Sequence, residues 1–173
     1  MVTKEVIQNQ REDLAAAYRL AAQFSFNEGI DNHITAKVPG YPDRFLLIPY
    51  GQHWAEVTAS SLLGVDNRGE RVEGDGFVEP TAFHIHNSIH TARPEVNCVM
   101  HCHPPYPLAL CMIKDGRLEY ADQNACRFFG KVAYDDDYPG AAFDAAEGKR
   151  IAQVLGDKDI LFMANHGITV VGS

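Results

Sequence analysis

Two short apolar runs, far apart in the chain, each lead into histidine, and they constrain the fold most. The run 96–100 is followed by His101 and His103, and the run 160–164 comes just before His166. Apolar runs of this length predict buried strands. Because alternate residues of a strand share a face, His101 and His103 point the same way. Two core strands that deliver three imidazoles to one place predict a divalent-metal site with coordination positions left open for a substrate.

The bulk composition predicts one globular domain and argues against some partners. The chain has 173 residues, 46% of them apolar, and a net charge of −8. The negative charge argues against a nucleic-acid-binding surface and against a polybasic membrane anchor. No apolar run reaches the ~20 residues that a membrane span needs. The first residues show no signal-peptide pattern, so we expect a cytoplasmic protein. The four cysteines show no disulfide framework and are expected to be reduced.

The pattern along the chain predicts short, turn-linked strands early and helices between the later ones. We therefore expect a mixed, mostly antiparallel sheet flanked by helices, and not a doubly wound one. The expected helices are 11–24, a short one from Thr58 to 63, 80–92, one after Pro105, 122–129 and 143–155. The expected strands are 33–38, 45–48, a hairpin over 65–72, 96–103 and 159–163.

Other histidines and cysteines near the first pair have plainer interpretations. A His-x-His pair alone is as often an ordinary pair as a metal site, and His166 is what favours the metal. Cys98 and Cys102 have the opposite strand parity to His101, so we expect them in the core. His86 and His90 share one face of the helix 80–92, and we favour a polar helix face as their role.

Several segments resemble the class II aldolase/adducin family, and the resemblance runs from about Leu14 to the end. They are 32–35, 49–51, 80–83, 92–104, 134–140 and 165–167. The resemblance implies an α/β, three-layer fold with a central mixed, mostly antiparallel sheet and helices on both sides. It also implies a homotetramer with active sites at subunit interfaces. His101, His103 and His166 would be the ligands of one divalent metal ion per chain, most commonly zinc, with manganese, cobalt or iron in some branches.

The resemblance also bears on domain organisation. Family members usually continue past the segment 165–167 with helices that can carry a catalytic tyrosine. We therefore expect residues 1–173 to form a single class II aldolase/adducin-like domain that lacks its C-terminal helices.

The chain departs from the sugar-phosphate aldolases of the family at the catalytic carboxylate. Their acid/base Glu stands nineteen residues before the first metal histidine, and Ala82 occupies that position here. Glu79, one helical turn earlier, can serve as a substitute base or as a fourth ligand. Its alternative role is that of a helix N-cap.

The substrate pocket departs too. Asn32 and His33 stand where the aldolases have a Gly-Asn phosphate-binding pair, and Pro80 replaces a serine, which weakens a phosphate pocket. The residues that can still line a pocket are Asn32, Thr35, Gly51, Thr81 and Gln123. His33 or His84 can donate a proton if either faces the metal. The pattern is similar to the adducin-like branch, whose head domains lack the metal histidines. This chain retains them, which favours an enzyme.

The residues therefore predict a divalent-metal-dependent carbon–carbon lyase that acts on a small oxo or hydroxy-oxo acid through a metal-stabilised enolate. Retro-aldol cleavage needs a base for the hydroxyl proton, whereas decarboxylation does not. Because Ala82 stands where the aldolases have that Glu, we favour a decarboxylase over an aldolase and keep the aldolase as the alternative. The alternatives are a non-haem iron oxygenase on the same three histidines and a non-catalytic adducin-like assembly module.

Overall fold

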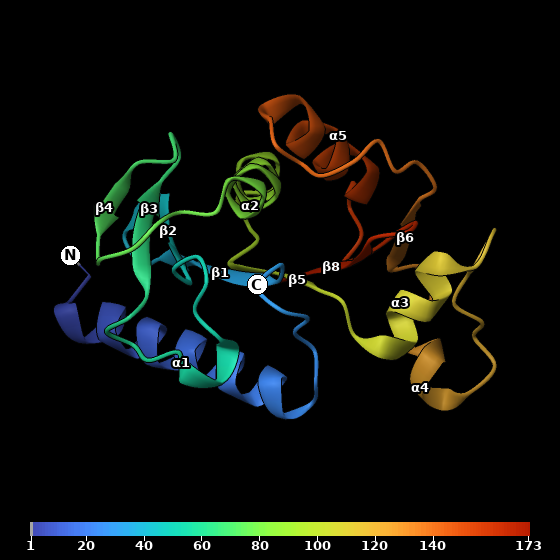
Figure 1. Cartoon of the computed structure of the whole chain (residues 1–173), viewed down its shortest axis with the longest axis horizontal. Helices are drawn as coiled ribbons and strands as arrows, with labels where there is room; N and C mark the ends of the chain where they lie inside the picture. Colours follow the sequence, from blue (N-terminus) through green and yellow to red (C-terminus); the bar gives the residue numbers. More distant parts are fainter. Residues whose placement is uncertain (1) are drawn as a thin grey trace.

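The computed structural model describes residues 2–173 and contains one sheet with helices on both faces (Figure 1). The helices are α1 (Lys4–Gln23), α2 (Pro80–Ala92), α3 (Pro105–Met112), α4 (Gln123–Cys126), α5 (Ala145–Leu155) and a 3-10 turn at Trp54–Glu56. The strands are β1 (His33–Val38), β2 (Tyr41–Leu47), β3 (Leu63–Asp66), β4 (Arg71–Glu73), β5 (Cys98–Cys102), β6 (Val132–Asp135), β7 (Ile160–Met163) and β8 (Gly167–Gly172).

The sheet has eight strands in the order β4-β3-β2-β1-β5-β8-β7-β6. Adjacent strands pair antiparallel except β6 and β7, which are parallel. Helices α2 and α5 lie on one face of the sheet, and α1 and α3 lie on the other (Figure 1). The α/β fold with a mostly antiparallel central sheet is therefore confirmed. In residues 2–173 we find no helix that is both long and apolar enough to cross a bilayer.

Each face of the sheet has its own apolar core. Buried side chains of α1 and the early strands, such as Tyr18, Leu46 and Leu63, form the first core. Side chains of α2, α5 and the central strands, such as Ile85, Ile151 and Leu161, form the second. The central strands β1, β5 and β8 are thus covered on both faces, and the histidines of β1 and β5 lie on the α2 side.

The structure corrects the predicted elements at three places. The short helix expected from Thr58 is wrong: residues 58–61 form a turn in which the Thr58 and Ser61 hydroxyls accept backbone N–H bonds. Such local bonds compete with helix formation. Strands β6 and β8 were not expected. β6 is a four-residue edge strand that ends in a buried carboxylate, Asp135, and β8 follows the 164–166 turn directly.

Candidate metal centre

The three histidines predicted as ligands converge at one end of the central strands. His101 lies in β5, His103 just beyond it, and His166 in the turn between β7 and β8. Their ligand atoms all lie within 4.8 Å of one another, and the Nε2 atoms of His101 and His103 are 3.2 Å apart. In a tetrahedral zinc site with Zn–N bonds of about 2.05 Å, neighbouring nitrogens lie about 3.3 Å apart. The geometry of this pair therefore fits a divalent ion.

The hydrogen bonds of the first two ligands leave the correct atoms free. His103 Nδ1 lies 2.9 Å from a Glu28 carboxylate oxygen, so Nδ1 donates and Nε2 keeps its lone pair. His101 Nδ1 lies 3.3 Å from the Thr169 hydroxyl. Burial holds the pKa of His101 well below its usual range and lowers that of His166 to about 4. Imidazole nitrogens that converge in this way are the donor set that a divalent metal requires.

The segment 165–167 has a physical explanation at each position. Asn165 adopts a left-handed conformation with φ of 56°, which asparagine tolerates, and its N–H donates to the Cys111 carbonyl. This turn places His166 beside the other two histidines. A Cβ on Gly167 would lie 2.3 Å from His103 Cδ2 and 2.9 Å from the Cys102 carbonyl oxygen. Gly167 therefore makes room for the His103 ring against β8.

Gly167→Ala is expected to weaken metal binding while the chain still folds. The added methyl group would overlap the His103 ring and the Cys102 carbonyl oxygen, so the ring must shift, and disturbing what orients a ligand histidine typically costs about 10–100-fold in metal affinity. Zinc affinity measured by competition with a chromophoric chelator checks this. Gly172→Ala, in the same strand, is the matched control because a Cβ there meets nothing within 4 Å. Equal affinities for the two variants would show that Gly167 does not shape the site.

Four of the predicted site residues lie together next to the histidines. Asn32, His33, Gly51 and Glu79 all line one hollow of about 10 Å³, which is space for about one water molecule. The His33 ring stacks on His101, with centroids 5.1 Å apart. Asn32 holds the preceding loop, because its side chain accepts the Glu28 N–H and donates to the Asp31 carbonyl.

Glu79 is the N-cap of α2 in the structure. Its carboxylate accepts hydrogen bonds from the Ala82 N–H and from the Thr81 hydroxyl, at 2.5 and 2.6 Å. Thr81 therefore uses its hydroxyl within the cap. Ala82 is fully buried where the aldolases of the resemblance carry their acid/base Glu.

Two other predicted site residues are placed elsewhere. His84 lines a groove between α2 and α5 together with Asn87 and Lys149, on another side of the helix from His86. Gln123 is exposed on the short helix α4. Within residues 2–173, neither makes a hydrogen bond to the three clustered histidines or lines the hollow beside His33.

His86 and His90 share one polar face of α2, as expected, but that face is not open to solvent. Both side chains are buried against β1 and hydrogen-bond to the Thr35 hydroxyl. Thr35 is itself fully buried, so its predicted place in a substrate pocket is corrected as well. The helix face is polar because it covers a polar strip of the sheet, and that pairing cannot be seen in the sequence of the helix alone. Burial holds the pKa of His86 well below its usual range and lowers that of His90 to about 4.

The cysteines behave as expected from strand parity. Cys102 is buried in the α1-side core, and Cys98 packs against that core. Burial raises the pKa of the Cys98 thiol to about 11 and that of Cys102 to about 12. All four cysteines are free, and none belongs to the histidine cluster.

Sequence reasoning missed Glu28, which contacts the metal centre through His103. The carboxylate lies in the loop before β1, and its side chain is 65% exposed. A carboxylate on the outer nitrogen of a ligand histidine fixes the ring orientation and raises the basicity of the ligand. The only available signal was its place five residues before His33.

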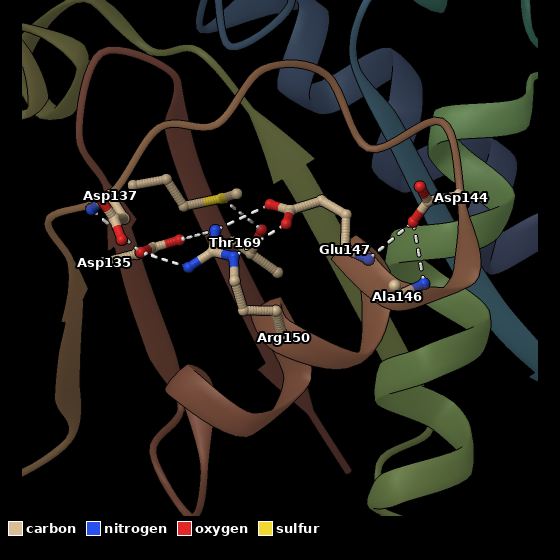
Figure 2. A network of polar contacts seen from close by, with 8 residues as sticks. Asp135, Asp137, Asp144, Ala146, Glu147, Arg150 and Thr169 are labelled. Atoms are coloured by element: carbon tan, nitrogen blue, oxygen red, sulfur yellow. Dashed lines mark hydrogen bonds and ion pairs between the residues drawn. The ribbon is translucent and has the colours of Figure 1, made fainter.

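A second polar network supports the neighbouring edge of the sheet. Arg150 of α5 donates two hydrogen bonds to Asp135 of β6, at 2.8 and 2.6 Å, and two to Glu147. Figure 2 shows the guanidinium between the two carboxylates, with Thr169 beside them. Hydrogen bonds to Glu147 and Asp135 raise the pKa of Arg150. The Thr169 hydroxyl donates to Met163 Sδ and lies 3.3 Å from His101 Nδ1, and in residues 2–173 no hydrogen bond joins it to Arg150 or the two carboxylates.

The match to a family model agrees with this geometry. The model of the class II aldolase and adducin N-terminal domain matches residues 12–173, so the chain belongs to that family. Among curated relatives, an adducin-related protein of Schizosaccharomyces pombe is 44% identical over 165 residues, which are 91% of this chain and 50% of that protein. The decarboxylase NovR of Streptomyces niveus is 34% identical over 160 residues, 91% of this chain and 59% of that protein. The chain thus spans little more than half the length of these relatives.

Solved structures with the same fold point to the same family. An aldolase II superfamily protein from Pseudomonas syringae has a TM-score of 0.91 and 36% identity, covering 99% of this chain and 68% of that one. An L-fuculose 1-phosphate aldolase from Glaciozyma antarctica has a TM-score of 0.89 and 30% identity, covering 99% of this chain and 67% of that one.

Proposed function

We propose that this chain carries the metal centre of a divalent-metal-dependent carbon–carbon lyase that acts on a small 2-oxo or hydroxy-oxo acid. The observation that carries the proposal is the convergence of three imidazoles, with the Nε2 atoms of His101 and His103 3.2 Å apart. Family membership supports a lyase, and relatives named a decarboxylase and an aldolase are consistent with either reaction.

His101, His103 and His166 would hold the ion, with zinc as the first candidate and manganese, cobalt or iron as alternatives. A divalent ion held there would supply positive charge to the oxygens of a bound oxo acid while its carbon–carbon bond breaks. Glu28 would orient His103, and Thr169 would orient His101. His33, stacked on His101, would face the bound molecule from the sheet side.

Decarboxylation is the reaction that these residues favour. In the aldolases of the resemblance a carboxylate takes the proton of the substrate hydroxyl during retro-aldol cleavage, and Ala82 stands in its place here. The Glu79 carboxylate already accepts two hydrogen bonds as a helix cap. Loss of carbon dioxide needs no such base, only later protonation of the carbanion.

Following the resemblance, we further propose a homotetramer, which light scattering at micromolar concentration would test.

The test begins with metal analysis of the purified protein and continues with a screen of 2-oxo acids. Carbon dioxide release without an aldehyde identifies a decarboxylase, and aldehyde release identifies an aldolase. Either activity should disappear with a chelator and return with the metal. Oxygen consumption by an iron-loaded protein would replace the lyase with an oxygenase. A protein that binds no divalent metal would contradict the proposal and favour an assembly module.

Glu79 distinguishes the two reactions further. Glu79→Gln keeps an oxygen acceptor for the Ala82 N–H but loses the carboxylate, whereas Glu79→Ala loses both. We expect Glu79→Ala to lower the free energy of unfolding by about 1 kcal/mol. We expect Glu79→Gln to leave turnover within a few-fold of the unmodified protein. Urea denaturation and the carbon dioxide assay check the two results. A loss of about 10²–10⁴ in rate for Glu79→Gln at unchanged metal content would instead make Glu79 the general base.

A further inference from the structure

A continuous row of hydrogen bonds joins four buried polar side chains between β1 and α2. His33 Nδ1 lies 2.7 Å from His86 Nε2. The Thr35 hydroxyl lies 2.7 Å from His86 Nδ1 and 2.9 Å from His90 Nε2. His90 Nδ1 lies 3.3 Å from the Val96 carbonyl oxygen. We call His33, His86, Thr35 and His90 the histidine row.

The carbonyl at one end sets the direction of every bond in the histidine row. A carbonyl oxygen can only accept, so His90 Nδ1 carries the hydrogen and His90 Nε2 carries a lone pair. That lone pair accepts the Thr35 hydroxyl hydrogen. The hydroxyl oxygen, its hydrogen used, must then accept from His86 Nδ1.

The last bond reaches the metal centre. Because His86 Nδ1 carries the hydrogen, Nε2 of the neutral His86 ring is a lone pair and accepts from His33 Nδ1. The neutral His33 ring then has its own lone pair on Nε2. In the described residues, no donor reaches this atom, and it is not among the enclosed unpartnered atoms. It is therefore not fully enclosed, and His33 lines the small hollow with Asn32 and Glu79 while its ring stacks on His101.

We propose that the histidine row holds His33 in a single tautomer, with hydrogen on Nδ1, so that Nε2 is a fixed hydrogen-bond acceptor at the metal centre. Thr35, His86 and His90 are positioning residues: they act only through His33. Because these side chains are buried, water is kept away from His33 Nδ1. A water molecule there could either donate or accept a hydrogen bond and would permit both tautomers. The direction set at the Val96 carbonyl is thus passed from His90 through Thr35 and His86 to His33.

A fixed acceptor selects the chemistry of the bound molecule. It pairs with a hydroxyl group or a water molecule, and it repels the oxygens of a phosphate or a carboxylate, which carry no hydrogen. This step rests on the proposed function and names its substrate more closely, as an oxo acid that carries a hydroxyl group.

The tautomer is measured directly by long-range ¹H–¹⁵N correlation NMR on the ¹⁵N-labelled protein as purified. We expect His33 to show a protonated Nδ1 and an unprotonated Nε2 at neutral pH. A protonated Nε2, alone or in an imidazolium, would overturn the proposal. Thr35→Ser keeps the hydroxyl and should preserve the wild-type pattern, whereas Thr35→Val should mix the two His33 tautomers. An unchanged His33 in a folded Thr35→Val variant would also overturn it, and the wild-type spectrum decides if that variant does not fold.

Ligand selection is tested separately with hydroxypyruvate and pyruvate as probes on the zinc-loaded protein. We expect hydroxypyruvate to bind more tightly by up to about tenfold, and His33→Phe to abolish the difference. Equal affinities in the unmodified protein would overturn the selection of a hydroxyl group. Neither readout involves turnover. A failed carbon dioxide assay would therefore count against the proposed reaction alone, and a wrong tautomer against the histidine row alone.

Discussion

Replacing His166 with alanine is expected to abolish stoichiometric metal binding by an otherwise folded protein. Two imidazoles remain in that variant, on alternate positions at the end of one strand, and they supply only two of the three ligands. Loss of a residue that hydrogen-bonds to a ligand histidine already costs about 10–100-fold in metal affinity, so loss of a ligand should cost more than about 100-fold. His166 is half-buried in a turn at the end of the sheet, so its side chain contributes little to either core.

Metal content after dialysis and thermal unfolding both measure this effect. A ligand present at 1,000 times its dissociation constant stabilises the folded state by about 4 kcal/mol. The unmodified protein should therefore unfold at a higher temperature with zinc than with a chelator, and His166→Ala should show no such difference. His84→Ala is the matched control, because His84 lies in the groove between α2 and α5. A His166→Ala protein that keeps one tightly bound ion would remove His166 from the site.

The ligand set could be predicted because it depends on local rules. Strand parity alone places His101 and His103 on one face and sends Cys102 to the other. His166 was visible as a histidine at the end of an apolar run. The turn that aims it depends on Asn165 in a left-handed conformation and on the space above Gly167. The sequence shows these two residue types but not the contact they serve.

The partners of the ligands could not be predicted, because they arise from pairing between distant segments. His33 lies opposite His101 only because β1 and β5 pair in that register. His86 is buried, not solvated, because α2 packs its histidine face over Thr35. Glu28 reaches His103 from a loop about 75 residues away in the chain. The periodicity of a helix sequence shows that one helix face is polar, but it does not show which part of the sheet that face covers.

Arg150→Met is expected to lower the free energy of unfolding by about 3–5 kcal/mol. The change leaves two carboxylates without their cation, and the Asp135 side chain is only 3% exposed. Removal of one partner from a buried ion pair is costly because the remaining charge stays buried without compensation. For a chain of this length, each kcal/mol lowers the midpoint of thermal unfolding by about 2–4 °C. The expected fall is therefore at least about 6 °C, and urea denaturation would give the free energy itself.

Two further variants show whether the effect belongs to the ion pair. Lys131→Met removes a cation at the start of β6, where Lys131 lies 3.6 Å from Asp159 with both side chains about half exposed. An exposed pair contributes at most about 1 kcal/mol, so this control should unfold nearly like the unmodified protein. Arg150→Met combined with Asp135→Asn should recover part of the loss, because the buried negative charge is then absent. If Arg150→Met costs no more than Lys131→Met, Arg150 does not hold α5 on β6.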